Sequence, residues 1–387
     1  MPTKLLFLGV LSYSTHSLLR FLSEHGYEVT VINACHLSTF KRVYGTNIPV
    51  YNLYENSKIS AMFKGPQAWR RKAILYELAK NLNLKRDALR SILDETETEL
   101  VYGTYGTRSL PECGMAQKLH VPLVYEFLCY PWTFRKFGED FDNFMFKRIV
   151  NSLDGRVFPS QRMYDYMKNV LGIHTGENLF YMECFPEKFY YRRRLPLLSE
   201  VDGQPHIVFT GSNVRARMVF SQIEEIASRR IHVHLARAPD EQEDSTEECT
   251  FKDSGFVHPF TWFSFEDIAD GTYATFLTQF DACVVTNNFW RYSCQARFHN
   301  TIPSRFSLTI PAGIPFVVPE GYMQACEDII NEYQIGFAYR NYTELRDKLY
   351  DKSMMKNYQE NAIKNAQLFS LESNFVKLDK FLKRLIE

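Results

Sequence analysis

Short apolar runs alternate with helical patterns along the first half of the chain. A buried-strand pattern at Lys4–Val10 is followed by a helical pattern at His16–His25 and a second strand pattern at Tyr27–Asn33. Further strands are expected at 99–104, 121–127 and 154–159, with helices at 68–93, 110–119 and 161–171, and residues 180–183 close this half of the chain. This alternation predicts a parallel sheet flanked by helices. The dinucleotide fingerprint G-x-G-x-x-G is absent, so the first unit is of Rossmann type without that motif.

The second half of the chain repeats the pattern. Strands are expected at 207–210, 231–236, 255–260, 280–286 and 314–318, and helices at 273–279 and 322–332. Residues 344–387 have a mostly helical pattern. We therefore predict an α/β fold with two Rossmann-like domains, at residues 1–187 and 188–368, and a final helix at 369–387.

Composition narrows the class of protein. Hydrophobic residues make up 45% of the 387 residues, as in globular proteins. Lys plus Arg and Asp plus Glu are both 45, and this balance argues against nucleic-acid binding, which needs a basic surface. The 8 cysteines form no C-x-x-C pair, and no stretch reaches transmembrane length. We expect a cytoplasmic protein; the locally basic stretch at 70–86 is either a solvated helix face or a contact to the inner face of a membrane.

The stretch Ile302–Glu320 carries the strongest chemical signal. Pro303 suits the first turn of a helix, and Ser304 would then leave free N–H groups at a positively polarised helix end. Arg305 adds a forked cation that matches phosphate oxygens. Gly313 allows a tight turn before a buried strand. The stretch predicts a diphosphate pocket, although an ordinary helix–turn–strand unit without a ligand would show the same pattern.

Within this stretch the run PSRFSLTIPAGIP resembles the PNKLFEYMAAGVP pattern of family-4-like GT-B glycosyltransferases. The matching positions are Pro303, Arg305, Phe306, Ala312, Gly313 and Pro315. The resemblance implies a GT-B fold, with two Rossmann-like domains facing across a cleft and a segment that holds the diphosphate end of a nucleotide-sugar. It also implies that the final helix, at 369–387, crosses back and packs on the first domain. Leu308 stands where the family has a glutamate that grips the donor ribose. The ribose contact is therefore expected from elsewhere, or the donor differs.

A second run, VYEFLCYPW, resembles the VYEVRDLW segment of the same family. Glu126 and Trp132 match, whereas Cys129 replaces the family's aspartate. Because loops after parallel strands line α/β clefts, Glu126, Tyr130 and Trp132 are expected on the acceptor side, together with Ser14 in the first loop. A polar residue at a strand end can equally be a cap or a surface contact.

The resemblance also suggests the remaining donor contacts. Gly211 follows a strand, and Arg215 and Arg217 are the candidates for neutralising the diphosphate, although their spacing differs from the family's G-R-x(4)-K. Surface arginines are the alternative. The other expected donor contacts are His258 at the nucleobase, Asn288 past a strand end, and Asn300 at the sugar.

Two catalytic routes remain open from the sequence. An inverting enzyme needs a base near the acceptor hydroxyl, and His16, Glu126 and Asp140 are candidates. A retaining enzyme can rely on the donor phosphate, as the resemblance implies. Asp140 and Asp142 spell D-x-D but stand at a predicted helix start, where acids favour the helix dipole, so no metal is expected.

These patterns lead to one functional hypothesis and two rivals. We predict a metal-independent glycosyltransferase without a cofactor, which uses a nucleotide-diphosphate-sugar and a glycan, lipid-linked or small-molecule acceptor. A nucleotide-sugar epimerase on the same fold would need acid and base residues on both sides of the sugar, and no clear set is present. A non-catalytic partner subunit would explain Cys129 and Leu308.

Overall fold

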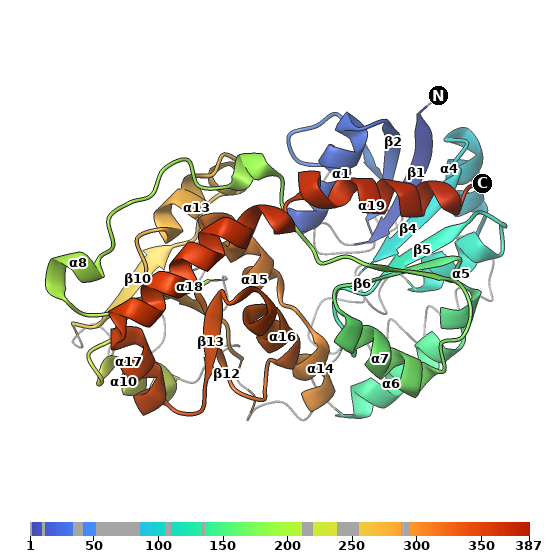
Figure 1. Cartoon of the computed structure of the whole chain (residues 1–387). Coiled ribbons are helices and arrows are strands. Elements are labelled where there is room, and N and C mark those ends of the chain that lie inside the picture. The colour runs from blue at the N-terminus through green and yellow to red at the C-terminus, as the bar shows by residue number, and fades with distance from the viewer. Residues whose placement is uncertain are drawn as a thin grey trace, which may run out of the picture. The chain divides into compact units, whose positions relative to one another are not determined.

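The computed structural model describes residues 2–9, 12–33, 42–51, 86–104, 110–132, 136–210, 220–237, 255–287, 289 and 294–387. The chain forms two compact units (Figure 1). Unit 1 contains Met1–Tyr181 and Phe375–Glu387, and unit 2 contains Met182–Asn374. The boundaries expected from the sequence, at 187 and 368, lie close to these divisions.

Unit 1 is built on a parallel sheet with the strand order β3-β2-β1-β4-β5-β6-β7. Its strands are β1 (Thr3–Gly9), β2 (Tyr27–Asn33), β3 (Val50–Tyr51), β4 (Leu100–Thr104), β5 (Leu123–Glu126), β6 (Gly155–Phe158) and β7 (Glu177–Phe180). Its helices are α1 (Tyr13–Glu24), α4 (Arg86–Glu95), α5 (Leu110–Gln117), α6 (Lys136–Lys147) and α7 (Gln161–Leu171), with a 3₁₀ turn η2 (Val150–Ser152).

Unit 2 repeats this design with the order β10-β9-β8-β11-β12-β13. Its strands are β8 (His206–Phe209), β9 (His232–Arg237), β10 (Val257–Thr261), β11 (Ala282–Val284), β12 (Phe316–Pro319) and β13 (Gly336–Tyr339). Its helices are α8 (Ser199–Asp202), α10 (Phe220–Ala227), α12 (Phe265–Ala269), α13 (Thr272–Leu277), α14 (Gln295–Asn300), α15 (Ser304–Thr309), α16 (Gln324–Tyr333), α17 (Tyr342–Tyr350) and α18 (Lys352–Asn365). The 3₁₀ turns are η3 (Glu187–Phe189), η5 (Ile310–Ala312) and η6 (Ala366–Phe369).

The last helix, α19 (Leu371–Arg384), begins in unit 2 and continues in unit 1. In unit 1 the Tyr27 hydroxyl donates to Asp379 Oδ1 at 2.8 Å, and the rings of Phe21 and Phe375 meet edge to face. In Figure 1 this helix lies beside α1. The packing confirms the expected return of the final helix to the N-terminal strands.

The observed elements follow the hydrophobic pattern, with differences at their ends. The helix expected at 16–25 begins at Tyr13, because Ser12 caps it and accepts a hydrogen bond from the Thr15 backbone N–H. The strand expected at 280–286 is shorter, and most of the helix expected at 68–93 lies outside the described residues. Within the described part of the chain, no helix is both long and apolar enough to cross a membrane.

Candidate functional site

The six-stranded sheet of unit 2 reverses its strand order between β8 and β11. In open α/β sheets, ligands bind outside the carboxyl ends of the strands at such a switch point. Thr210 directly follows β8, and Thr286 and Asn287 lie just past β11. The side chains and backbone groups at this edge therefore define the first part of the candidate site.

Helix α15 is fixed against the ends of both central strands by a small polar cluster. Thr309 Oγ1 donates to the Arg305 carbonyl at 2.8 Å and lies 3.3 Å from Thr210 Oγ1. Cys283 Sγ, from β11, lies 3.6 Å from each of these threonine hydroxyls. Because all these groups are buried and hydrogen-bonded, they hold α15 in one position at the switch point.

Arg305 brings a positive charge to this edge. Its side chain is 6% exposed, and its guanidinium donates to the backbone carbonyl of Thr286, just beyond β11. Burial raises the pKa values of the Cys283 and Cys326 thiols, so neither thiol offers a negative charge to the nearby guanidinium. The charge predicted from the sequence is present at the switch point, anchored to the backbone.

The other residues of the predicted pocket have mainly structural contacts. Ser304 is the first residue of α15, after Pro303, while the Phe306 ring is fully buried and stacks on Phe316 at 4.0 Å. Gly313 ends η5 with φ 58°, where an added Cβ would lie 3.2 Å from Ile363. Leu308 is buried and apolar, so it cannot supply the ribose contact that the sequence resemblance led us to look for at this position.

Two of the remaining predicted donor contacts, Asn300 and His258, lie within the described residues. Asn300 is buried and donates to the Ala296 carbonyl of its own helix, α14, at 2.8 Å. His258 lies near the start of β10, whereas ligands in such sheets bind at the strand ends, so we do not include it in the proposed donor site. Gly211, Arg215, Arg217 and Asn288 lie outside the described residues.

In unit 1, Glu126 is the last residue of β5 and lies level with Thr104 at the end of β4. Gly9 ends β1 beside them, where an added Cβ would lie 2.6 Å from Thr104 Cγ2. The Glu126 side chain is 3% exposed, and burial raises its pKa to about 7, while hydrogen bonds from Tyr102 and Thr104 oppose the shift. A carboxyl group with this pKa can take up or release a proton near neutral pH.

His16, the other predicted base, has a different environment. It lies in α1, is 4% exposed, and its Nδ1 accepts a hydrogen bond from the Tyr44 backbone N–H at 3.1 Å. Burial lowers its pKa to about 4, which makes it a weak base at neutral pH. Ser14, predicted on the acceptor side, is buried beside it, and its hydroxyl lies 2.9 Å from that of Ser12.

Two aromatic residues were predicted to contact an acceptor. Tyr130 is fully buried: its ring packs against Phe127 and Phe146, and its hydroxyl donates to Asn143 Oδ1 at 2.5 Å. Its contacts are those of a core residue, so it is left out of the proposed site. Trp132, which follows the cis Tyr130–Pro131 bond, is partly exposed.

The D-x-D acids lie on α6 and differ in exposure. Asp140 is exposed and Asp142 is buried, as expected for residues two positions apart on a helix, which face different directions. Among the described residues, the group of histidine, cysteine and acidic side chains that brings metal-ligating atoms together is elsewhere, at Asp202, His206 and His232.

Threonines at the carboxyl ends of the strands organise both units, and they were not among the residues predicted from the sequence. Thr210 and Thr309 connect α15 to the strand ends in unit 2, and Thr104 faces Glu126 in unit 1. Thr104 and Thr210 share one signal, a hydroxyl residue at or just past the end of an apolar run, whereas Thr309 lies inside a short helical segment. That signal occurs too often in sequences to select these positions without the sheet topology.

No family model and no curated protein matches the chain. Among solved structures, it is similar to sucrose-phosphate synthase from Thermosynechococcus elongatus, with a TM-score of 0.70 and 12% identity over 100% of this chain and 99% of that chain. It is also similar to a glycosyltransferase from Rickettsia africae, with a TM-score of 0.66 and 13% identity over 100% and 99% of the two chains. Anabaena HepE in complex with UDP gives a TM-score of 0.67 and 12% identity over 99% and 100%.

These similarities extend over essentially the whole length of the chain and of each neighbour. With the two parallel sheets of 7 and 6 strands, they show that the chain has the GT-B fold, built from two Rossmann-like units. At 12–13% identity the likeness is one of fold, and the function has to be argued from the site.

Proposed function

We propose that the chain is a glycosyltransferase that moves a sugar from a nucleotide-diphosphate-sugar to an acceptor hydroxyl. The observation that carries the proposal is Arg305, a cation anchored at the switch point of the unit 2 sheet, in a chain with the GT-B fold. Support for the donor class comes from the neighbour HepE, whose structures contain UDP and UDP-glucose.

The proposed donor site lies at the carboxyl ends of β8 and β11. Arg305 and the N-terminal amides of α15 would face the diphosphate, and Arg215 and Arg217 are the further cations that the sequence offers. During transfer the bond from the anomeric carbon to the diphosphate oxygen breaks, and negative charge grows on the leaving group. Positive groups held in place before the reaction stabilise that charge most effectively. We propose that these arginines supply the charge, so that transfer needs no metal at the diphosphate.

On the acceptor side, Glu126 is a stronger base than His16, the other buried candidate. The acceptor oxygen forms the new bond to the anomeric carbon, and its proton passes to a base. In an inverting reaction Glu126, with a pKa of about 7, would take that proton. In a retaining reaction the donor phosphate would take it, as the family resemblance implies. The anomeric configuration of the product distinguishes the two routes.

The first test is nucleotide binding by Arg305 variants. In calorimetry with UDP, GDP, ADP and dTDP, we expect one nucleoside diphosphate to bind wild type and to bind Arg305→Ala at least about tenfold more weakly, since a charged hydrogen bond is lost. Arg346→Ala removes an exposed arginine from α17 and is the matched control. Equal affinities in wild type and Arg305→Ala would remove Arg305 from the site, and no binding by any nucleotide would contradict the proposed donor class.

The second test concerns the reaction. With the preferred nucleotide-sugar, we expect release of nucleoside diphosphate that accelerates when acceptor sugars or an extract of lipid-linked acceptors are added. An epimerase would interconvert nucleotide-sugars without acceptor. A non-catalytic subunit would bind the nucleotide and release nothing, and either result would overturn the assignment as a transferase.

A further inference from the structure

Four histidines lie on one face of the unit 2 sheet, near the N-terminal ends of β8, β9 and β10. His206 lies level with His232, and His234 lies level with His258, in neighbouring parallel strands. Because alternate residues of a strand point to the same face, all four rings lie on one side of the sheet. The proposed donor site lies at the opposite, carboxyl ends of the strands.

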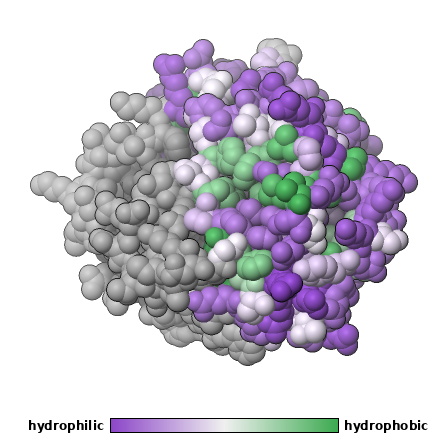
Figure 2. All heavy atoms as spheres, turned by 90° about the vertical axis from the view of Figure 1, so that its left-hand side faces the viewer, coloured by the Kyte–Doolittle hydropathy of each residue, from purple (hydrophilic) through white to green (hydrophobic). Residues whose placement is uncertain are grey.

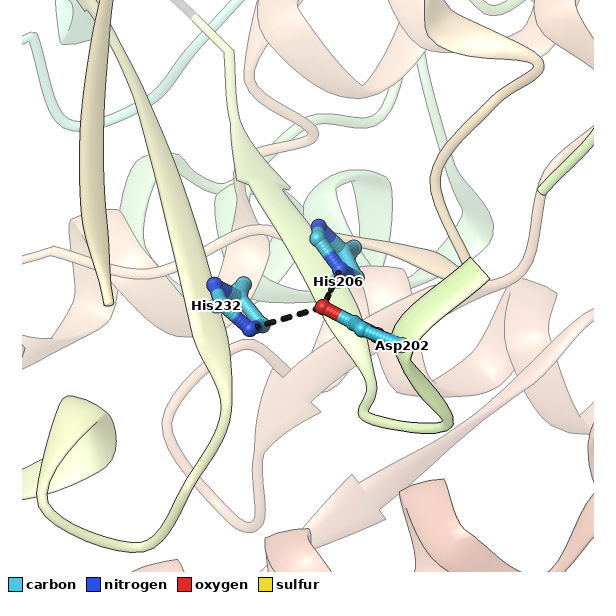
Figure 3. Close-up of side chains that lie close together, drawn as sticks. All are labelled: Asp202, His206 and His232. Atoms are coloured by element: carbon cyan, nitrogen blue, oxygen red, sulfur yellow. Dashed lines mark hydrogen bonds and ion pairs between the residues drawn. The ribbon is translucent and has the colours of Figure 1, made fainter. Parts of the chain in front are cut away.

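Two of these rings point at one carboxylate. Asp202, the last residue of the short helix α8, places Oδ2 at 3.1 Å from His206 Nε2 and at 3.0 Å from His232 Nε2 (Figure 3). The three potential ligand atoms lie within 4.8 Å of one another. The His232 Nε2 atom is buried, and although it lies close to Asp202 Oδ2, the two atoms are not oriented for a hydrogen bond.

The two outer histidines complete the arrangement. His206 Nδ1 lies 3.0 Å from His234 Nε2, and His232 Nδ1 lies 2.8 Å from His258 Nε2. Metal-binding histidines almost always donate their second ring N–H to a neighbouring acceptor, which fixes the orientation and tautomer of the ring. Here each inner histidine already has such an acceptor, which is a feature independent of the three converging ligand atoms.

We propose that Asp202, His206 and His232 bind a zinc ion, with His234 and His258 as the partners that orient the two histidine ligands. Histidine nitrogen and carboxylate oxygen are both good zinc ligands, and three protein ligands leave the fourth position for water. Tetrahedral zinc with ligands at 2.0–2.1 Å separates its ligand atoms by roughly 3.4 Å. The present separations of 3.0 and 3.1 Å from Asp202 Oδ2 need to grow by only a few tenths of an ångström.

Binding would change the rings in a defined way. The His206 and His232 rings are stacked, with centroids 4.2 Å apart and planes 10° from parallel. A shared ion requires both lone pairs to point at it, so the rings would tilt towards each other on the Asp202 side. At the same time the Nδ1 atoms of His206 and His232 would carry the ring protons and donate hydrogen bonds to His234 and His258. This is a change of tautomer, so no net uptake or release of protons is needed.

The ion can reach this site from water. The Asp202 side chain is 35% exposed, whereas His206 and His232 are 8% and 12% exposed. The face of unit 2 that carries α8 is largely hydrophilic, with hydrophobic side chains gathered near its centre (Figure 2). The ion would connect α8 to the first residues of β8 and β9, so its expected effect is to stabilise unit 2 rather than to take part in sugar transfer.

The test is a zinc titration of the untagged, chelator-treated full chain against a competing chromogenic indicator. We expect one equivalent to bind with micromolar or tighter affinity, and one equivalent of CoCl₂ to give the visible absorption of four-coordinate cobalt. Asp202→Asn and His232→Gln should each weaken zinc binding at least about tenfold. His120→Asn removes an exposed histidine from unit 1, keeps a residue type that tolerates the positive φ there, and should bind zinc like wild type.

The proposal fails if wild type binds zinc only weakly or in less than stoichiometric amount, a result that needs no variant to fold. It also fails if the folded Asp202→Asn and His232→Gln chains, checked by circular dichroism, keep the wild-type affinity. Neither result depends on the proposed glycosyltransferase activity, because the readouts are metal affinity and cobalt absorption.

Discussion

Burial moves the pKa values of Glu126 and His16 in opposite directions. In both residues the low-dielectric surroundings disfavour the charged form, so the acid becomes weaker and the base becomes weaker. At neutral pH the glutamate is therefore close to half-ionised, whereas the histidine is neutral and accepts a hydrogen bond from the Tyr44 N–H. Burial therefore leaves Glu126 suited to proton transfer near neutral pH, whereas it makes His16 a weak base whose observed contact is the hydrogen bond from Tyr44.

Glu126 should make the stability of unit 1 depend on pH. Its pKa is about 7 in the folded chain, against the ordinary glutamate value of 4.5, so the folded state holds the proton more tightly. The resulting stability is fully present below about pH 4.5 and is lost as pH rises through 7, by up to about 3 kcal/mol. Buried His16, whose pKa is lowered to about 4, changes stability in the opposite sense between pH 5 and pH 8, so the contribution of Glu126 is measured as a difference between variants. In urea unfolding, stability should fall from pH 5 to pH 8 by about 2–3 kcal/mol more in wild type than in Glu126→Gln. The exposed acid variant Glu28→Gln should keep the wild-type difference, and an unchanged difference in Glu126→Gln would refute the assignment.

The sequence could predict that Glu126 ends a strand, but it could not predict that Tyr130 is buried. In a parallel sheet, an acid that ends a buried strand lies at the carboxyl ends of the strands, and the β-rich run before Glu126 favours a strand. The aromatic run that follows is compatible with an open cleft or with a core, and only packing against Phe127 and Phe146 decides between them. Long-range contacts of this kind have no local signature in the chain.

At the scale of elements, the two sides of α19 differ: one packs on the unit 1 sheet and the other faces solvent. Phe381 is 2% exposed and its ring covers Gly155 of β6, where an added Cβ would lie 2.8 Å away. Val376, on the same helix, is 73% exposed. The sequence pattern predicted a helix here, and the family resemblance implied its return to the first domain. The end of β11 was less predictable, because Val285 and Thr286 continue the apolar run after the strand has ended.

Phe381→Ala should destabilise unit 1 by about 3–5 kcal/mol, since it leaves a cavity between α19 and the sheet. Val376→Ala removes apolar atoms from the solvent-exposed side of the same helix and should change stability by less than about 0.5 kcal/mol. Hydrogen exchange of the β6 amides measures the effect within unit 1, without requiring both units to unfold together. Similar exchange rates in the two variants would show that α19 contributes little to this core.

For the whole chain, the repeated strand order explains why the sequence predicts so much of the architecture. Both sheets use the order of a doubly wound fold, and each reverses at its first strand, β1 or β8. The pattern of apolar runs appears twice in the sequence and predicts the two units. The histidine cluster was missed because its members are far apart in sequence and become neighbours only through the register of β8, β9 and β10.

Unit 2 then carries two proposed sites at opposite edges of one sheet. Strand β8 has 4 residues, and at a rise of about 3.3 Å per residue it separates the edges by roughly 13 Å. At this distance neither ligand would touch the residues of the other site, and the Asp202 carboxylate would offset part of the zinc charge, so the ion should act only weakly on a diphosphate at the other ends of the strands.

We therefore expect nucleotide and zinc to bind independently. The affinity for the preferred nucleoside diphosphate should agree within about twofold between zinc-loaded and chelator-treated chains, and zinc affinity should be equally unaffected by the nucleotide, because linkage is reciprocal. Hydrogen exchange should show nucleotide protection in α15 and zinc protection at α8 and the starts of β8 and β9. A tenfold mutual effect would mean that the sheet transmits a structural change between its edges. Protection of the same segments by both ligands would mean that at least one site is misplaced, and the exchange pattern would identify which.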